Sequence, residues 1–481
     1  NRRRAGEILL VMIAVAVVAS LFIFLYSKSV GFAGVAAALV IVTASVYPHV
    51  LVGSSDDKHV DIAGSAPFLA TYTLVLALLL LALPFAARGG NVGFWLWVPF
   101  IGWLIIGMCS FWSSSSEHWA GILQLALAPA AWFIGAYSGK QVARLPRLGS
   151  HIIGIVGFVF SVQLVVCMMQ AVGIRINPLA ADQQAILGDR YNGTLAHPDD
   201  LGKVIFFLIV LLLPLLNHAS KRTLRLGACV IAIGIGVLVL TGGRAVLVSA
   251  LVAIAVYALV MPTNAGRLGP RLTILAGVGA ATLFASGVLI ERFSEDPEGG
   301  ARNSLTQLAL GQIAQRFWTG TGPNSYVTVV GQLDALTASG VPVHNAVLLA
   351  AGELGVPGAA LLLLPFVLTL WLALKRSRRI GYAGDFARAI IAMTPGLCLA
   401  GATGWGLLGS YVLPVFTFVV AFLYGGLISG KKSSHVDGAD PLSSLRGSNA
   451  GSDSRDTLEL GQRLSQIVSA EQRTKKVGKV Q

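Results

Sequence analysis

Residues 409–429 read GSYVLPVFTFVVAFLYGGLIS, a run that contains no charged side chain. A helix of about 20 apolar residues spans the roughly 30 Å hydrocarbon core of a bilayer. Runs of similar length recur along the rest of the chain, which predicts an all-α polytopic integral membrane protein. They cover residues 7–26, 31–52, 66–86, 92–112, 119–138, 151–173, 201–218, 224–241, 245–262, 271–290, 346–374 and 386–404.

The composition agrees with this prediction. Of the 481 residues, 55% are hydrophobic and 12% are charged, whereas soluble domains carry about 25% charged residues. The net charge of +13 comes from short Lys and Arg clusters between apolar runs, which is typical of topology signals and argues against a nucleic-acid-binding face. The four cysteines lie within apolar runs and lack the spacing of a disulfide framework or a zinc site. No metal and no cofactor are therefore predicted.

The polar intervals between the runs alternate in charge. Basic clusters lie at residues 88, 140–147, 221–225, 267–271, 375–379 and 431–432. The positive-inside rule assigns these intervals to the cytoplasm and faces the intervening ones outward. The outward intervals are 53–65, 113–118, 174–200, 291–343 and 405–408.

The number of spans follows from this alternation. Thirteen crossings would leave the N-terminal triple Arg outside, against the same rule, so we expect about 12 transmembrane helices, with one of the first two runs a partial or re-entrant crossing. Residues 1–430 would form the transmembrane domain. Residues 431–481 are rich in Ser, Gly, Lys and Asp, which predicts a disordered cytoplasmic tail.

The two longest outward intervals, 174–200 and 291–343, are longer than ordinary connections, and such loops commonly carry function. Apolar residues at helical spacing in the second loop predict a short amphipathic helix on the outer surface, with Asn303 or Ser304 as its N-cap. The residues at that spacing are Leu305, Leu308, Ala309, Ile313 and Phe317.

Four arginines lie in or beside the outward intervals, where few are expected: Arg190, Arg244, Arg302 and Arg316. One interpretation is that they contact lipid headgroups or form internal ion pairs. Arg244 fits this least well, because no acidic residue lies within ten positions of it. Guanidinium groups match phosphate oxygens bidentately, so a cluster of arginines can hold a diphosphate leaving group without a metal.

His344 lies where the long outer loop meets the next apolar run, on the same predicted side as the arginines. A single His at a helix start is more often structural. Here, neighbouring cations would lower its pKa and leave a neutral imidazole able to accept a proton near pH 7. We assign His197 only a helix-start role, with Asp199 or Asp200 as the cap. Glu353 follows nine residues after His344, on the opposite helix face, and is expected to pack.

These residues resemble the bacterial O-antigen ligases, within the O-antigen ligase and polymerase superfamily. The signature of that family is His, then Asn, Ser or Gln, nine further residues, and Gly-x-x-Gly. It reads here as His344-Asn345, nine residues, and Gly355-Val356-Pro357-Gly358. Similar patches occur in the same order as in the family, and the resemblance covers about residues 185–375. They are RYNGTLAH at 190–197, TGGRAVL at 241–247, and Arg302 followed by GTGPNSY at 320–326.

The resemblance implies a GT-C-like fold with a long periplasmic loop that contains short helices. It also implies transfer of a glycan from undecaprenyl diphosphate to a lipid A–core sugar hydroxyl, at the periplasmic face of the bacterial inner membrane. His344, Arg244 and Arg302 would be catalytic. Arg190, Asn345 and Arg316 complete the predicted substrate-binding set. The partners would be the lipid-linked donor, the lipid A–core acceptor and membrane lipids, and the displacement would be inverting.

Three alternatives remain at this stage. An O-antigen polymerase or a protein O-oligosaccharyltransferase would use the same donor and differ in the acceptor. A lipid-linked sugar transporter or flippase belongs to another class. The sequence disfavours it, because we find no paired interrupted helices and no buried charge pairs at mid-membrane depth.

Overall fold

The fold comes from a computed structural model. The structure describes residues 31–46, 50–52, 69–86, 97–109, 116–174, 176, 190–261, 271, 275–280, 302–404, 406–409 and 411–429. The chain divides into two units, Asn1–Gly430 and Lys431–Gln481, and all described residues lie in the first. The predicted run at 7–26, most of the run at 271–290 and the predicted tail at 431–481 lie outside the described residues.

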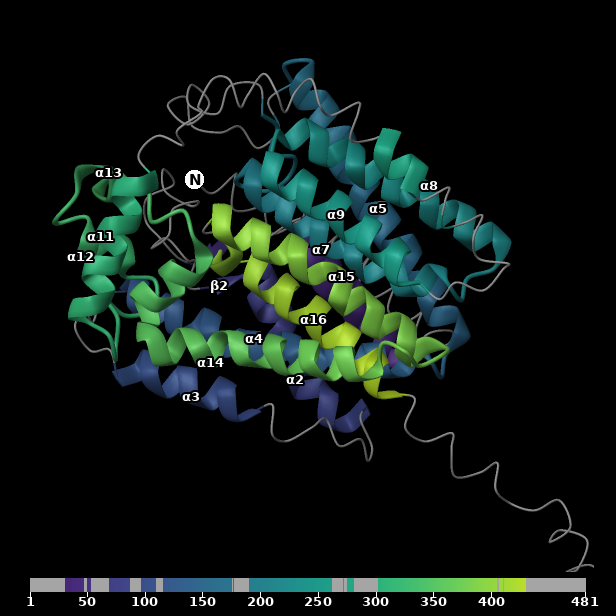
Figure 1. The fold of residues 1–481 in the computed structure, drawn as a ribbon, viewed down its shortest axis with the longest axis horizontal. Coiled ribbons are helices and arrows are strands. Elements are labelled where there is room, and N and C mark those ends of the chain that lie inside the picture. The colour runs from purple at the N-terminus through teal and green to yellow at the C-terminus, as the bar shows by residue number, and fades with distance from the viewer. Residues whose placement is uncertain are drawn as a thin grey trace, which may run out of the picture. The chain divides into compact units, whose positions relative to one another are not determined.

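Helices account for most of the described residues, as the apolar runs predict (Figure 1). Six are long and apolar enough to cross a membrane, and four shorter apolar helices accompany them. This confirms a helical membrane protein, whereas the count of 12 spans and the GT-C-like arrangement stay predictions. The bundle contains Gly31–Ser45, α2 (Thr71–Ala86), α3 (Trp97–Cys109), α4 (Ser116–Val142), α5 (Pro146–Ala171), α7 (Pro198–Leu216), α8 (Lys221–Thr241), α9 (Arg244–Val260), α14 (Ala346–Arg376), α15 (Tyr382–Thr403) and α16 (Val412–Ser429).

One short element departs from the all-α prediction. Strand β1 (Val50–Val52) pairs in antiparallel fashion with β2 (Leu69–Ala70). The pair lies next to the start of α2, at the edge of an interval that was predicted to be a loop.

Helix α7 lies at the centre of the bundle. All but one of residues 198–215 are buried, because the helix is apolar on every side and packs against α5, α8, α9, α15 and α16. A helix that is hydrophobic all round belongs in such a position. Its place therefore fixes the residues at its two ends relative to the surrounding helices.

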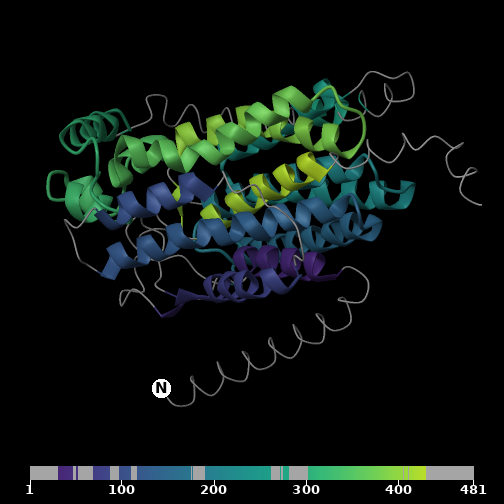
Figure 2. The ribbon, with the colours of Figure 1, turned by 90° about the horizontal axis from the view of Figure 1, so that it is seen from below.

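Helices α4 and α16 are in close contact through glycines. A Cβ on Gly135 or Gly139 of α4 would strike the backbone of α16, and one on Gly425 would strike the backbone of α4. Small residues allow two membrane helices to approach at this distance and gain van der Waals contact. Figure 2 shows the result, with α16 running between α4 and the pair α14 and α15.

Helix α14 is broken at Gly355, which has φ 69° and ψ 169°. The preceding outer segment supplies the missing hydrogen bonds: Val356 N donates to Phe317 O at 2.8 Å, Thr321 N to Gly352 O at 2.8 Å and Gly322 N to Glu353 O at 2.9 Å. The sequence predicted one continuous run over 346–374 and missed this interruption. The break gives the first glycine of the Gly-x-x-Gly signature a structural reason.

The connections between helices separate into two groups at opposite ends of the bundle. At one end, Arg376 Nη1 donates to Leu427 O at 3.1 Å and His218 Nε2 lies 2.8 Å from Asp385 Oδ2. At the other end, Ala196 N donates to the Tyr411 hydroxyl at 3.3 Å. The first contacts involve the connections that follow α7 and α14, and the second joins the segment at 190–197 to the residue before α16, so these described connections agree with the predicted alternation. Which end faces outward stays a prediction.

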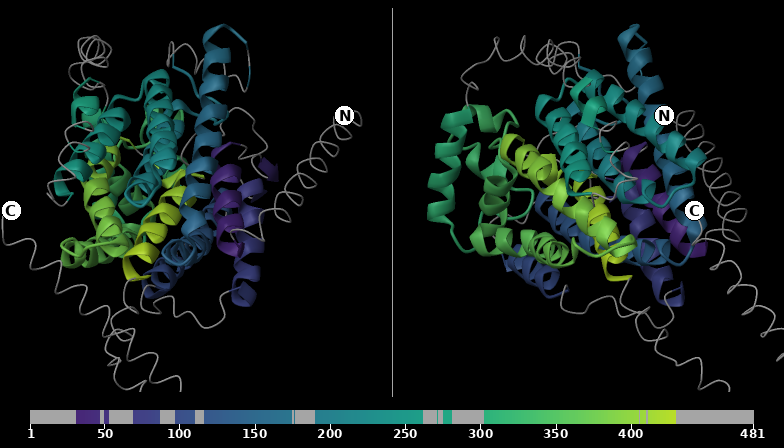
Figure 3. Two further views of the ribbon diagram at one scale, coloured as in Figure 1. Left: turned by 90° about the vertical axis from the view of Figure 1, so that its right-hand side faces the viewer. Right: turned by 45° about the vertical axis from the view of Figure 1, so that its right-hand side comes forward.

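The described part of the long outer loop contains short helices, α11 (Arg302–Gln315), α12 (Tyr326–Val330) and α13 (Ala335–Ala338). They lie together beside the start of α14 (Figure 3). Leu305, Ala309 and Ile313 are buried as the spacing predicted. The predicted cap is wrong, because α11 already begins at Arg302 and Asn303 and Ser304 lie in its first turn. Phe317 follows the helix and is 43% exposed.

The break in α14 predicts a large effect for Gly355→Ala. An alanine there would adopt a backbone conformation that is nearly restricted to glycine, with its Cβ 2.5 Å from Trp318 O. We expect a loss of about 2–4 kcal/mol in the free energy of unfolding, measured by thermal unfolding in detergent. Gly236→Ala, inside α8 with open space around it, is the matched control and should be neutral or stabilising by up to about 1 kcal/mol. Equal unfolding temperatures for the two variants would contradict this account.

Candidate functional site

Residues 190–197 are held against α5 by glutamine side chains. Gln163 Nε2 donates to Thr194 Oγ1 at 2.6 Å, and Thr194 N donates back to Gln163 Oε1 at 3.0 Å. Gln170 exchanges similar bonds with Asn192 and Gly193. The segment therefore enters α7 along a fixed path, and Arg190 and His197 at its ends are fixed with it.

His197 is the N-cap of α7. Its Nδ1 accepts a hydrogen bond from the backbone N–H of Asp199 at 3.1 Å. Burial lowers the pKa of His197, so the ring is neutral and its proton is on Nε2. The predicted helix-start role of His197 is confirmed. The predicted capping by Asp199 or Asp200 is wrong, because both carboxylates have other partners.

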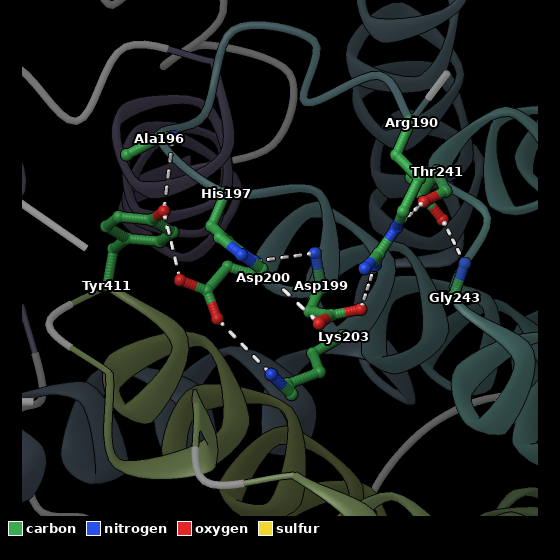
Figure 4. Close-up of polar contacts among 9 residues, drawn as sticks. All are labelled: Arg190, Ala196, His197, Asp199, Asp200, Lys203, Thr241, Gly243 and Tyr411. Atoms are coloured by element: carbon green, nitrogen blue, oxygen red, sulfur yellow. Dashed lines mark hydrogen bonds and ion pairs between the residues drawn. The ribbon is translucent and has the colours of Figure 1, made fainter. Parts of the chain in front are cut away.

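Asp199 forms an ion pair with Arg190 Nη2, and Arg190 Nε donates to Thr241 O at 2.9 Å (Figure 4). The Arg190 side chain is 12% exposed and that of Asp199 is 41% exposed. The Arg190 guanidinium is therefore held by two partners and largely buried, whereas the Asp199 side chain is partly exposed.

The Thr-Gly-Gly-Arg patch surrounds this ion pair. Gly242 ends α8 with φ 64°, and a Cβ there would lie 3.0 Å from Arg190 Cγ. A Cβ on Gly243 would lie 3.5 Å from Asp199 Oδ1, and Gly243 begins α9 without a capping side chain. Arg244 is the first residue of α9. The sequence near Arg244 contains no acidic residue, but the fold brings Asp199 close to it in space.

A second ion pair lies one turn further into α7. Lys203 Nζ is 3.3 Å from Asp200 Oδ1, and the side chains are 5% and 9% exposed. Tyr411 donates its hydroxyl proton to Asp200 Oδ2 at 3.3 Å. This pair is not among the residues predicted from the sequence, because Lys203 lies within the apolar run 201–218. The available signal was the Asp–Lys spacing of three residues, which places the two side chains on one helix face.

His344 immediately precedes α14, and Asn345 caps that helix by accepting from Val347 N at 2.9 Å and Leu348 N at 3.1 Å. The amide oxygen of Asn345 is thus occupied by the backbone. His344 Nδ1 is buried and has no hydrogen-bond partner in the described part of the chain.

The electrostatics of His344 connect α14 with α7 and α11. Burial lowers the pKa of His344, the positive charge of Arg302 lowers it further, and Asp199 opposes the shift. A contact with the Pro342 carbonyl also raises the pKa, and Lys203 lowers it slightly. The imidazole is therefore neutral at pH 7. These interactions also mean that Arg302, Asp199 and Lys203 all lie close enough to act on one ring.

Arg302 is the first residue of α11, and Arg316 directly follows its last residue, Gln315. Fourteen residues of helix separate them by about 21 Å along the axis, so the structure brings Arg302 to His344 and does not bring Arg316 there. Arg316 lies beside the α14 break, next to Phe317, and its buried Nη1 has no hydrogen-bond partner among the described residues. Of the predicted site residues, Arg190, Arg244, Arg302, His344 and Asn345 therefore gather at one end of the bundle.

Glu353 has a different environment from His344. Its carboxylate accepts hydrogen bonds from the backbone amides of Asn324 and Tyr326, in the GTGPNSY patch. Burial raises the pKa of Tyr326 to about 12, with smaller contributions from Glu353 and Asp334. This agrees with the packing role expected for Glu353, which anchors the outer segment to α14.

Residues 227–363 match the family model described as O-antigen ligase. The matched range contains Arg244, Arg302 and His344, and α7 precedes it. This confirms the resemblance to the O-antigen ligase superfamily. No curated protein matches the chain. Within the described residues, no group of three or more His, Cys, Asp or Glu side chains could hold a metal ion.

The buried Asp200–Lys203 pair predicts a strong dependence of stability on charge balance. Lys203→Met would leave a buried carboxylate without a cation, which typically costs about 3–5 kcal/mol. The double variant Lys203→Met/Asp200→Asn removes both charges and should recover most of that loss. Unfolding in detergent measures both. A single variant as stable as the wild type, or a double variant no better than the single one, would show that the pair is not a buried ion pair.

Proposed function

We propose that this protein is an O-antigen ligase of the bacterial inner membrane, with its active site facing the periplasm. It would transfer the glycan from undecaprenyl diphosphate to a sugar hydroxyl of the lipid A–core. The observation that carries the proposal is the position of His344, which shares one electrostatic environment with Arg302 and with the α7 end that holds Arg190. The match to the O-antigen ligase family supports the reaction class.

On the donor side, the diphosphate binds at the turn between α8 and α9, where Arg190 lies against Gly242 and Arg244 begins α9. Arg190 is held by Thr241 O and Asp199, and Arg244 begins α9 behind a glycine that carries no side chain. The amide groups at a helix start and its positive dipole end favour an anion there. As the C1–oxygen bond breaks, negative charge develops on the departing undecaprenyl diphosphate. Arg190, Arg244 and Arg302 stabilise that charge.

On the acceptor side, His344 orients the sugar hydroxyl and takes its proton as general base. The hydroxyl oxygen attacks C1 of the first glycan sugar while the diphosphate oxygen leaves from the opposite face, so the configuration at C1 inverts. The neutral state of His344 at pH 7 supports this role. The cations that act on the leaving group are guanidinium groups of the chain, so the proposed reaction is metal-independent and EDTA should leave it unchanged.

The alternatives differ in their products. A polymerase would extend the lipid-linked chain and a protein ligase would glycosylate a polypeptide, whereas a flippase would move the lipid-linked sugar without a covalent product. The structure adds an interrupted helix, α14, and buried ion pairs such as Asp200–Lys203. The break lies nine residues into its helix and the ion pair within the first two turns of α7. Neither is the paired mid-membrane arrangement of a transporter.

The proposal predicts loss of transfer in two variants. In the assay, membranes that contain the His344→Ala or Arg244→Ala variant are supplied with the lipid-linked glycan and the lipid A–core acceptor. The amount of lipopolysaccharide formed is then measured. We expect at least about a hundredfold loss in each, because one removes the proton acceptor and the other a leaving-group cation. Arg225→Ala, an exposed arginine at the opposite end of α8, is the matched control and should retain transfer. Full activity of both site variants would refute the assignment.

A second prediction concerns pH. His344 must be neutral to accept a proton, and its pKa lies below the usual 6.5, so the acid limb of kcat/KM should lie below pH 6.5. Arg302→Gln removes a charge that lowers this pKa, so the limb should move to higher pH. Arg316→Gln, at the far end of the same helix, should leave the position of the limb unchanged. If the acid limb of kcat/KM stays at the same pH in the Arg302→Gln variant, His344 is not the titrating base.

A further inference from the structure

Tyr411 connects two parts of the site that are far apart in the sequence. Its hydroxyl accepts a hydrogen bond from Ala196 N at 3.3 Å and donates one to Asp200 Oδ2 at 3.3 Å (Figure 4). Ala196 and Asp200 bracket the turn that contains His197 and Asp199. One oxygen atom from the start of α16 therefore holds both ends of the turn that begins α7.

We propose that Tyr411 is a positioning residue for glycan transfer, acting through Asp199 on Arg190. The inference rests on the proposed function and deepens it. The hydroxyl fixes the turn 196–200, this turn fixes the Asp199 carboxylate, and the carboxylate holds the Arg190 guanidinium against Thr241 O. Tyr411 contacts neither substrate in this scheme.

The surroundings of Tyr411 make its hydroxyl a strong anchor. Tyr411 is 5% exposed, and the Asp200 carboxylate that accepts its proton is paired through its other oxygen with Lys203. A hydrogen bond to an ionised group is about twice as strong as one between neutral groups, and a low local dielectric strengthens it further. The two carboxylate oxygens of Asp200 thus bind Lys203 and Tyr411 at the same time.

The segment before Tyr411 is shaped to allow this contact. A Cβ on Gly406 would collide with Asp200 and Lys203, and a Cβ on Gly404 would lie 3.7 Å from Lys203 Cε. A Cβ on Gly409 would lie 3.8 Å from Asp200 Oδ2. The absence of a side chain at Gly406 therefore lets the short helix Gly406–Leu408 lie directly on the ion pair, a few residues before Tyr411. Sequence reasoning gave this interval, 405–408, no role.

The decisive variant is Tyr411→Phe, which keeps the ring and removes only the oxygen. Displacement of a substrate-positioning group by about 1 Å can lower a rate by about a hundredfold. We therefore expect kcat/KM for the lipid-linked donor to fall by roughly tenfold or more, while KM for the lipid A–core acceptor changes little. Tyr424→Phe, about 20 Å further along α16, is the matched control and should retain wild-type kinetics.

A double-variant experiment separates positioning from a general structural effect. If Tyr411 acts through Arg190, then Arg190→Lys/Tyr411→Phe should be hardly worse than Arg190→Lys alone, because the group to be positioned is already altered. Losses that multiply would overturn the inference, as would wild-type kinetics for Tyr411→Phe. If Tyr411→Phe lowers the unfolding temperature, the double variant and Arg190→Lys are compared well below that temperature, where both are folded. The comparison of their rates then still tests the positioning role.

The experiment also separates this inference from the proposed function. A wild-type chain that transfers glycan, together with an unaffected Tyr411→Phe variant, would reject the positioning role and leave the ligase assignment intact. A wild-type chain without transfer would overturn both.

Discussion

The structure depends on charges placed at the start of an apolar, enclosed helix. The first two turns of α7 carry Asp199, Asp200 and Lys203, in surroundings where an uncompensated ion costs several kcal/mol. Each of the three has an opposite charge: Asp199 pairs with Arg190, and Asp200 pairs with Lys203. Satisfying these charges gathers three separate connections at one end of the bundle. They are the segment 190–197, the turn between α8 and α9, and the connection between α15 and α16.

The same arrangement leaves the site with an excess of positive charge. Arg190, Lys203, Arg244 and Arg302 supply four cations against the two carboxylates of Asp199 and Asp200, a formal balance of +2. An excess of this size suits a diphosphate group, whose own charge completes the neutralisation. The neutral rings of His197 and His344 add no further positive charge at pH 7. In this respect, the requirement of folding and the requirement of the proposed chemistry are met by the same side chains.

Some of this could be predicted from the sequence, because hydrophobic runs and short motifs are local. The helices begin and end within a few residues of most apolar runs, and the His344–Asn345 signature located one part of the site. Other features depend on contacts between distant segments. The bond of Asp200 to Tyr411 joins residues 211 positions apart, and the break at Gly355 is stabilised by residues 317–322. The Gly355-Val356-Pro357-Gly358 pattern is a local signal for an interruption, but it does not show which residues stabilise the break, and no local pattern pairs Asp200 with Tyr411.

The sequence also could not predict which end of a loop helix lies near His344. Arg302 and Arg316 both lie in the outer loop and were expected at one site, but the orientation of α11 brings only Arg302 to His344. Lys203 was missed for the opposite reason, because a single charge in an apolar run is hard to interpret until its partner is known. Both cases concern which residues meet across elements, whereas the coarser prediction of a helical membrane protein is confirmed.

The interruption of α14 has a mechanical consequence. Only the ten residues from Asn345 to Leu354 separate His344 from the break at Gly355, and backbone bonds from 317–322 attach the chain there to the outer segment. The imidazole is thus carried by a small cap made of α11 to α13 and the first part of α14. Arg190 lies outside this cap, in the segment that leads into α7, and Arg244 begins α9. Because these bonds reach Gly352 and Glu353 before the break and Val356 after it, the outer segment braces the interruption, and His344 keeps a fixed position relative to the rest of α14.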